Sequence, residues 1–190
     1  MAAGTKDRIM DTTAQLFQRY GYTGTGLKQI VAAANAPFGS IYHHFPNGKV
    51  QLGEEVIRRS GEMYRDLFEA IYDASPDVVS ATSNFFLGAA ETLRQTDYAD
   101  ACPIETVALE VASTNEPLRK ATADVFDSWI AAGTERLSEA GIPEAEARRL
   151  TIVFLSALEG AFVLCRASKT TEALEVAGTH MAETVRAALP

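Results

Sequence analysis

Cysteine and histidine are scarce in this chain, with two and three among 190 residues. Cys102 and Cys165 are too few for a disulfide scaffold and lack the spacing of metal ligands. We therefore expect both to be reduced thiols in buried or half-buried positions, with no metal site and no cofactor. His43, His44 and His180 form no Glu-x-x-His pair of the kind that di-metal helical bundles use.

Catalytic and membrane signals are missing as well. No local combination suggests a Ser-His-Asp or Cys-His set, so we predict that the protein is not an enzyme and has no catalytic residues. No apolar run approaches the roughly 20 residues that cross a bilayer. The first residues also lack the apolar core of a signal peptide. The sequence thus predicts a cytoplasmic protein with no membrane partner.

Positive charge is in deficit overall, with 17 Lys and Arg against 25 Asp and Glu and a formal net charge of -8. Its distribution is uneven. Residues 1–50 hold five cations and two acidic side chains, a net charge of +3. Since the whole chain has a net charge of -8, residues 51–190 carry -11. A basic N-terminal part on an acidic body fits a protein in which that part alone contacts phosphates. Five cations in fifty residues is also an ordinary surface density.

Helical periodicity, by contrast, runs through almost the whole chain, and no stretch alternates as a strand would. We predict an all-α fold. The expected helices cover about residues 5–20, 26–34, 37–45, 50–74, 76–95, 104–113, 117–140, 144–168 and 170–189. In the long helix from 50 to 74, the residues expected on the core side are Val56, Met63, Leu67, Phe68 and Ile71.

Residues 25–45 read as two short helices about a tight turn. Thr25 is expected to cap the first helix, and Asn35 tolerates the left-handed backbone that the turn needs. Pro37 suits the first turn of the second helix, in which Ile41 and Phe45 face inward. A second helix that is small and polar at its start is typical of a helix-turn-helix, which presents that helix to the DNA major groove.

At these residues the chain resembles the TetR family of bacterial transcriptional regulators. The matching positions are Gly21-Tyr22, Thr25, Ile30, Gly39, Ile41-Tyr42-His43, Phe45, Lys49 and Leu52. The run from Pro37 to Lys49 is similar to the LmrA/YxaF-type branch, as are Cys102-Pro-Ile104 and residues 107–113. The resemblance implies a three-helix DNA-binding domain at 1–48 and a helical regulatory domain at 49–190 for ligand binding and dimerisation.

The implied function is a ligand-responsive, DNA-binding regulator. By this resemblance it is a homodimeric repressor that a mostly apolar small molecule releases from a palindromic operator in double-stranded DNA. The alternative is a helical small-molecule-binding regulatory protein whose DNA binding is weak or lost.

Family resemblance assigns DNA contact to the third helix and its flanks. The expected DNA-binding residues are Thr25, Lys28, Pro37, Phe38, Gly39, Ser40, Tyr42, His43 and Lys49. Phe38 departs from the family pattern, which commonly has Lys there. Its ring can either pack on a thymine methyl or fold back onto the N-terminal domain.

The last two helices, about 144–168 and 170–189, are the expected dimer helices. The first is apolar over nearly its whole circumference, and a helix of that kind must be buried on all sides. A partner copy buries a terminal helix most simply, although an interior helix of a monomer would show the same pattern. A dimer would also supply the two-fold symmetry that reads a palindrome.

Aromatic, aliphatic and methionine residues on the inner helices are the candidates for a ligand pocket, although core residues show the same pattern. The expected ligand-binding residues are Met63, Leu67, Phe85, Phe86, Cys102, Ile104, Val107, Glu110, Val111, Phe126, Trp129, Leu155, Glu159 and Phe162. Glu110 and Glu159 lie in apolar runs where an unpaired charge is costly. Each should pair with an arginine such as Arg119 or Arg166, bond to backbone, or meet a ligand.

Overall fold

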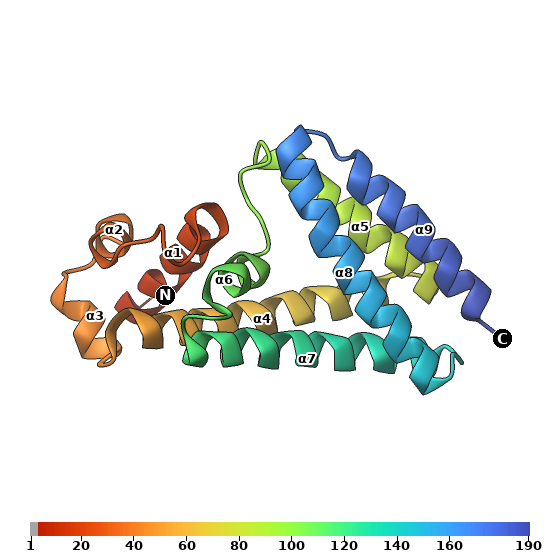
Figure 1. The fold of residues 1–190 in the computed structure, drawn as a ribbon, viewed down its shortest axis with the longest axis horizontal. Helices are drawn as coiled ribbons and strands as arrows, with labels where there is room; N and C mark the ends of the chain where they lie inside the picture. The colour runs from red at the N-terminus through yellow and green to blue at the C-terminus, as the bar shows by residue number, and fades with distance from the viewer. Residues whose placement is uncertain (1–3) are drawn as a thin grey trace. The chain divides into compact units, whose positions relative to one another are not determined.

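A computed structural model describes residues 4–190, which form helices joined by turns and loops (Figure 1). This range holds nine α-helices and no strand, which confirms the all-α prediction. The helices are α1 Thr5–Tyr20, α2 Leu27–Ala33, α3 Gly39–His44, α4 Gly48–Ala74, α5 Val78–Gln95, α6 Pro103–Val111, α7 Glu116–Glu139, α8 Glu144–Ser168 and α9 Glu172–Ala188.

The chain divides into two units. The N-terminal unit comprises residues 1–62 and 101–125, and the C-terminal unit comprises residues 63–100 and 126–190. The domain boundary predicted near Gly48 stays a prediction. Gly48 is the first residue of α4 and lies inside the N-terminal unit.

The core of the N-terminal unit is built from the first three helices together with the first part of α4, α6 and the start of α7. Its fully buried side chains include Ile9, Phe17, Ile30, Ile41, Phe45, Leu52, Ile104, Val107 and Leu118. The inward positions predicted for Ile41 and Phe45 are therefore confirmed. Because Ile41 within α3 and Phe45 directly after it are anchored in this core, Tyr42 and His43 are held at the surface.

Helix α4 is joined to its neighbours in this unit by close packing and by ion pairs. A Cβ at Gly61 would lie 2.5 Å from Val125 Cγ2, so only glycine allows α7 to approach this closely. Arg59 pairs with Asp7 at 3.3 Å and with Asp11 at 3.0 Å on α1, and the preceding residue, Arg58, pairs with Asp124 on α7 at 3.0 Å.

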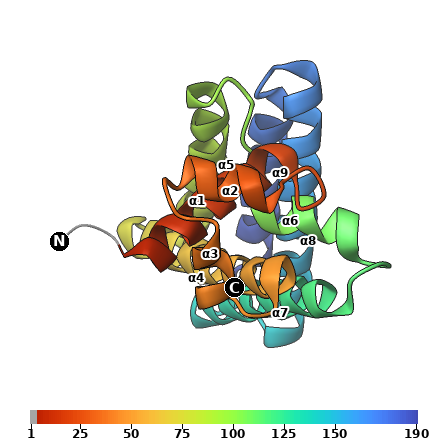
Figure 2. The same cartoon turned by 90° about the vertical axis from the view of Figure 1, so that its left-hand side faces the viewer.

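In the C-terminal unit, α9 lies alongside both α5 and α8 (Figures 1 and 2). The buried cluster among these helices contains Phe86, Ala90, Leu93, Phe154, Leu158, Ala161, Cys165, Leu174 and Met181. At Gly178 a Cβ would lie 2.6 Å from Phe86 Cβ, so α9 can approach α5 only because this residue has no side chain.

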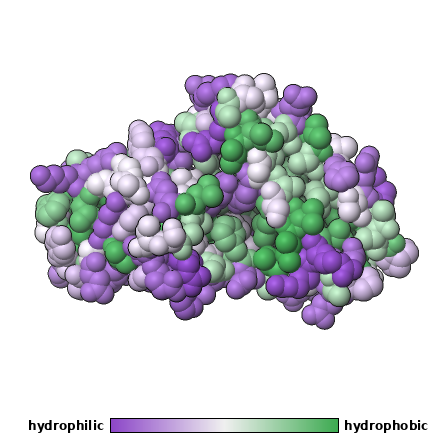
Figure 3. Space-filling view, in the orientation of Figure 1, coloured by the Kyte–Doolittle hydropathy of each residue, from purple (hydrophilic) through white to green (hydrophobic). Residues whose placement is uncertain are grey.

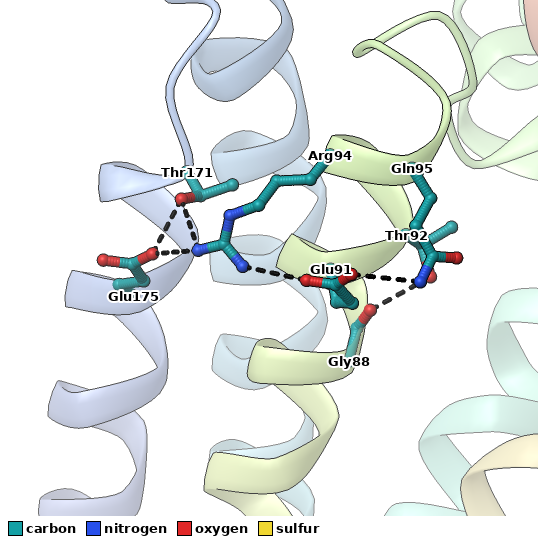
Figure 4. A network of polar contacts seen from close by, with 7 residues as sticks. All are labelled: Gly88, Glu91, Thr92, Arg94, Gln95, Thr171 and Glu175. Atoms are coloured by element: carbon teal, nitrogen blue, oxygen red, sulfur yellow. Dashed lines mark hydrogen bonds and ion pairs between the residues drawn. The ribbon is translucent and has the colours of Figure 1, made fainter.

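Polar contacts fasten one end of the α5–α9 pair (Figure 4). Arg94 on α5 donates to Glu91 on its own helix. It also donates to Thr171, at the start of α9, at 3.0 Å and to Glu175 on α9 at 2.7 Å. At the start of α5, the Asp77 side chain caps the helix by accepting from the Ser80 N–H at 2.7 Å. That bond lowers the pKa of the Asp77 carboxyl.

Helix α8 exposes apolar side chains along one face. Ile152, Val153, Val163 and Leu164 are 40 to 62% exposed, and Figure 3 shows hydrophobic residues gathered over this helix. By length and composition alone α8 could cross a membrane, which is weak evidence for a span but overturns the expectation that no segment approaches one. Gly160 belongs to the same helix, and its missing Cβ would meet nothing within 4 Å.

One sequence expectation about α4 is wrong. Met63 and Leu67, predicted on its core side, are 55% and 48% exposed. Val56 is buried as expected, so the apolar pattern identified the helix but not the length over which its face is covered.

Candidate DNA-binding surface and ligand region

Helices α2 and α3 are joined by the tight turn that the sequence predicts. Asn35 has a φ of 48°, in the left-handed region, and the Ala36 N–H closes the turn on the Val31 carbonyl at 2.9 Å. Helix α3 begins two residues after Pro37 and ends at His44, because the next residue, Phe45, leaves the helical region with a φ of -132°. The result is a six-residue helix with one buried side and one open side.

Most of the predicted DNA-binding residues lie on this open side or next to it. Lys28, Pro37, Phe38, Gly39, Tyr42 and His43 are exposed, and Ser40 is half-buried. They bring a cation, hydroxyl groups, an imidazole and an apolar ring to the surface around one short helix. Such a set can bond phosphates and contact base edges.

Thr25 is different, because its predicted capping role is wrong. The residue before α2 is Gly26, and the Thr25 side chain is fully buried. Its hydroxyl donates to the Gly21 carbonyl at 2.7 Å, which ties the end of α1 to the start of α2. The burial gives no support to a phosphate contact through this side chain.

Lys49 is held inside the N-terminal unit. Its ammonium donates to the Tyr22 carbonyl at 2.6 Å and lies 4.1 Å from the centre of the Tyr22 ring. Burial lowers the pKa of the Lys49 ammonium, and the charge of Glu110 acts against that shift. Lys49 thus joins the start of α4 to the turn after α1, and its predicted phosphate contact stays a prediction.

Glu110 of α6 is bound to the same turn. Its Oε2 accepts from the Thr23 backbone N–H at 2.6 Å. The carboxylate fills the space where a Cβ of Gly21 would be. Of the alternatives that the sequence left open, bonding to backbone is the one that the structure has, while Arg119 pairs with Glu116 on its own helix.

Sequence reasoning missed the partners of these two charged groups. Tyr22 and Thr23 were not expected in any site, and Gly21 and Tyr22 were named only as positions that match the family. A positive φ of 69° at Gly21, followed by an extended ψ of -179°, allows the chain to present the Thr23 N–H to α6. The available signal was the isolated carboxylate in an apolar run.

The expected ligand-binding residues fall in both units. Cys102, Ile104, Val107, Glu110 and Val111 belong to the N-terminal unit, and Met63, Leu67, Phe85, Phe86, Phe126, Trp129, Leu155, Glu159 and Phe162 belong to the C-terminal unit. Phe86, Ile104, Val107 and Val111 are buried among core residues. Cys102 and Cys165 are free thiols, as predicted. Oε2 of Glu159 is buried, and Arg166 donates to the Tyr98 and Ala99 carbonyls at 3.4 and 3.2 Å.

An aromatic cluster in the C-terminal unit borders a small cavity. Phe68 packs against Phe85 and Phe154, with ring centres 5.8 and 6.4 Å apart. The cavity, of about 10 Å³, is lined by Phe68, Tyr72, Thr82, Gly133, Leu137, Leu150, Thr151, Phe154, Met181 and Val185. None of these described residues is in the expected ligand set. The Tyr72 and Thr82 hydroxyls bond to each other at 3.1 Å, and burial raises the pKa of the Tyr72 phenol.

A helix-turn-helix in an N-terminal unit, followed by a helical second unit, defines a DNA-binding transcriptional regulator. The chain belongs to the TetR family. Residues 9–56 match the model of bacterial regulatory proteins of the tetR family, and residues 78–180 match the LmrA/YxaF-like C-terminal domain of transcriptional regulators.

Two relatives from Bacillus subtilis (strain 168) match nearly the whole chain. The chain is 37% identical to an uncharacterized HTH-type transcriptional regulator, YxaF, over 87% of this chain and 86% of that protein. It is 30% identical to the HTH-type transcriptional regulator LmrA over 90% of each chain. In fold it is similar to a TetR transcriptional regulator from Legionella pneumophila, with a TM-score of 0.86, 23% identity, and 96% and 98% of the two chains covered.

Proposed function

We propose that the protein is a homodimeric, cytoplasmic repressor that binds a palindromic operator and is released by a mostly apolar small molecule. The observation that carries the proposal is the open side of α3, whose polar and aromatic side chains are exposed while Ile41 and Phe45 anchor the helix. Repression follows the family resemblance.

Pairing of two copies is supported by the apolar face of α8. Ile152, Val153, Val163 and Leu164 expose apolar surface that a second copy would bury, and Val176 on α9 is 63% exposed. Gly160 leaves open space at its Cβ position, so a facing helix can approach closely there. Two N-terminal units related by a two-fold axis would suit two half-sites about one helical turn of DNA apart.

DNA contact is assigned to the exposed residues of α2, α3 and the turn between them. Lys28 supplies charge for a phosphate, and Tyr42 and His43 have the reach to bond phosphates on the groove walls. Gly39 allows close approach to the base edges, and Ser40 can bond to either a base or a phosphate.

Effector binding is assigned to the aromatic cluster of the C-terminal unit. The cavity beside it is about the size of one water, so a larger molecule must displace Phe68, Phe154 or their neighbours. An effector that binds the displaced arrangement better than the closed one shifts the balance between two states. The paired Tyr72 and Thr82 hydroxyls offer it a polar anchor.

The test measures binding to DNA from upstream of the protein's own gene by fluorescence anisotropy, at several salt concentrations and with random DNA as competitor. A repressor of this kind prefers its own site, and its affinity falls steeply with salt. Equal binding to both DNAs would favour the alternative, a small-molecule-binding protein with weak or lost DNA binding. Phenol and toluene, added to the complex, probe effector release by an aromatic molecule with and without a hydroxyl.

A further inference from the structure

Phe38 is an exposed aromatic residue in a unit whose core is complete without it. Phe17 and Phe45 are fully buried, whereas the Phe38 side chain is 45% exposed. Its ring meets the Tyr42 ring edge to face, with centres 6.1 Å apart and planes at 61°, and Tyr42 is itself 53% exposed. Phe38 is therefore not part of the core, and its ring packs on a neighbouring side chain while keeping much of its surface open.

The backbone fixes where this ring stands. Phe38 precedes the first residue of α3 in a helical conformation, and its carbonyl accepts from the Ile41 N–H at 3.2 Å. The next residue, Gly39, has no side chain, and its Cβ position faces open space with nothing but its chain neighbours within 4 Å. Tyr42, one turn later, supports the ring from the same side of the helix.

We propose that Phe38 is a specificity-determining residue that packs on the C5-methyl group of a thymine in each half-site of the operator. The argument rests on the proposed function, because it takes α3 as the helix that enters the major groove. A phenyl ring has no atom that can bond a phosphate or a polar base edge. The thymine methyl is the apolar group that base pairs present in the major groove. Contact between it and the Phe38 ring removes apolar surface of both from water, which is favourable.

The test uses operator DNA selected by the wild-type protein from a random pool. Each thymine of the half-site is then replaced symmetrically by deoxyuridine, which removes the methyl group and leaves base pairing unchanged. At one position we expect the wild-type Kd to rise about fourfold per half-site, the factor to which roughly 0.8 kcal/mol of methyl burial converts. With Phe38→Ala, deoxyuridine at that position should change the Kd by less than about 1.5-fold, a loss of the coupling that a double-mutant cycle measures.

A matched control is Leu109→Ala, which removes an apolar side chain that is 75% exposed on α6 of the same unit. This variant should keep the full deoxyuridine effect. Circular dichroism would establish that each variant is folded. The proposal is overturned if no thymine shows the effect in the wild-type protein, or if Phe38→Ala keeps it. If selection yields no preferred sequence, the proposed DNA-binding function is overturned as well. A preferred sequence without the deoxyuridine effect overturns the role of Phe38 alone.

Discussion

The Thr23 backbone N–H donates to Oε2 of Glu110 at 2.6 Å, across 87 positions of the chain. This bond ties α6 to the turn between α1 and α2, and Lys49 reaches the same turn through the Tyr22 carbonyl. The turn leads directly into the helix-turn-helix. Its geometry is therefore set by charged side chains from α4 and α6 as well as by its own sequence.

Replacing Glu110 should show how much the carboxylate contributes. Glu110→Ala leaves the Thr23 N–H without this acceptor and should lower the free energy of unfolding by about 1 kcal/mol. Glu110→Gln keeps an acceptor oxygen and should lose less than half of that. Urea denaturation of the three proteins measures the difference. Equal loss in both variants would mean that the charge, and not the hydrogen bond, carries the effect.

Gly21→Ala should be more harmful than a surface substitution. The backbone at Gly21, with φ 69° and ψ -179°, costs an L-residue about 1–3 kcal/mol. The new Cβ would also overlap the Glu110 carboxylate. We expect a loss above about 2 kcal/mol in unfolding experiments. Adding Glu110→Ala should recover the part due to overlap only; full recovery would contradict the backbone argument.

A pair of helix glycines gives opposite predictions. Gly178→Ala places a Cβ 2.6 Å from Phe86 Cβ, so α9 must move from α5, and stability should fall by about 1–3 kcal/mol. Gly88→Ala on α5 meets nothing within 4 Å and should raise stability by about 0.5–1 kcal/mol through helix propensity. Thermal unfolding of both variants makes the comparison. A stabilised Gly178→Ala would mean that the helices separate freely.

Charge on the exposed face of α8 should separate the proposed dimer. Leu164 is 62% exposed, so Leu164→Glu leaves the monomer fold intact but puts a carboxylate into the apolar interface. We expect the dimer Kd to rise at least about 100-fold, from a cost of roughly 3 kcal/mol. Sedimentation should then report the monomer mass of 20.5 kDa. Leu109→Glu is the control on α6, and an unchanged dimer in Leu164→Glu would place the interface elsewhere.

Asp77 should make the stability of the C-terminal unit depend on pH. Its carboxylate caps α5, and the bond to Ser80 lowers the pKa of the carboxyl. Because the folded pKa is the lower one, the capping contribution is complete above the ordinary carboxyl pKa and is lost as pH falls through the folded value. Asp77→Ala should therefore be less stable than wild type at pH 7, with the gap closing in acid. Asp77→Asn caps without titrating, and its gap to Asp77→Ala should persist at low pH.

Local signals predicted the helices well because the residues that begin and end them act through their own neighbours. Asn35 has the left-handed backbone expected of it, and Pro143 directly precedes an α8 that covers the predicted 144–168. The start of α2 was placed one residue too early because a different local contact competed. The Thr25 hydroxyl bonds to the Gly21 carbonyl instead of capping the helix.

The sequence predicted which residue types the site contains, but not which groups they contact. The Glu110 carboxylate in an apolar run indicated that it needs a polar partner. The sequence did not identify that partner, because a backbone N–H is present at nearly every residue. In the same way, apolar residues at helical spacing identify a face without saying what covers it. Met63 and Leu67 were predicted on the core side for this reason and are exposed, and the cavity of the C-terminal unit is lined by residues outside the expected ligand set.

The ion pairs of Lys6, Arg58 and Arg59 bear on how such a regulator would search a genome. Lys6 lies 2.7 Å from Glu55, and both arginines are held by aspartates of the same unit. Nonspecific DNA binding depends on cations that displace counterions from the phosphates. Cations that are paired within the protein would contribute less to the affinity for random DNA. Fewer copies are then lost to the roughly 10⁶–10⁹ competing genomic sites. Sliding encounters would then be shorter, and arrival at the operator would rely more on repeated collisions from solution.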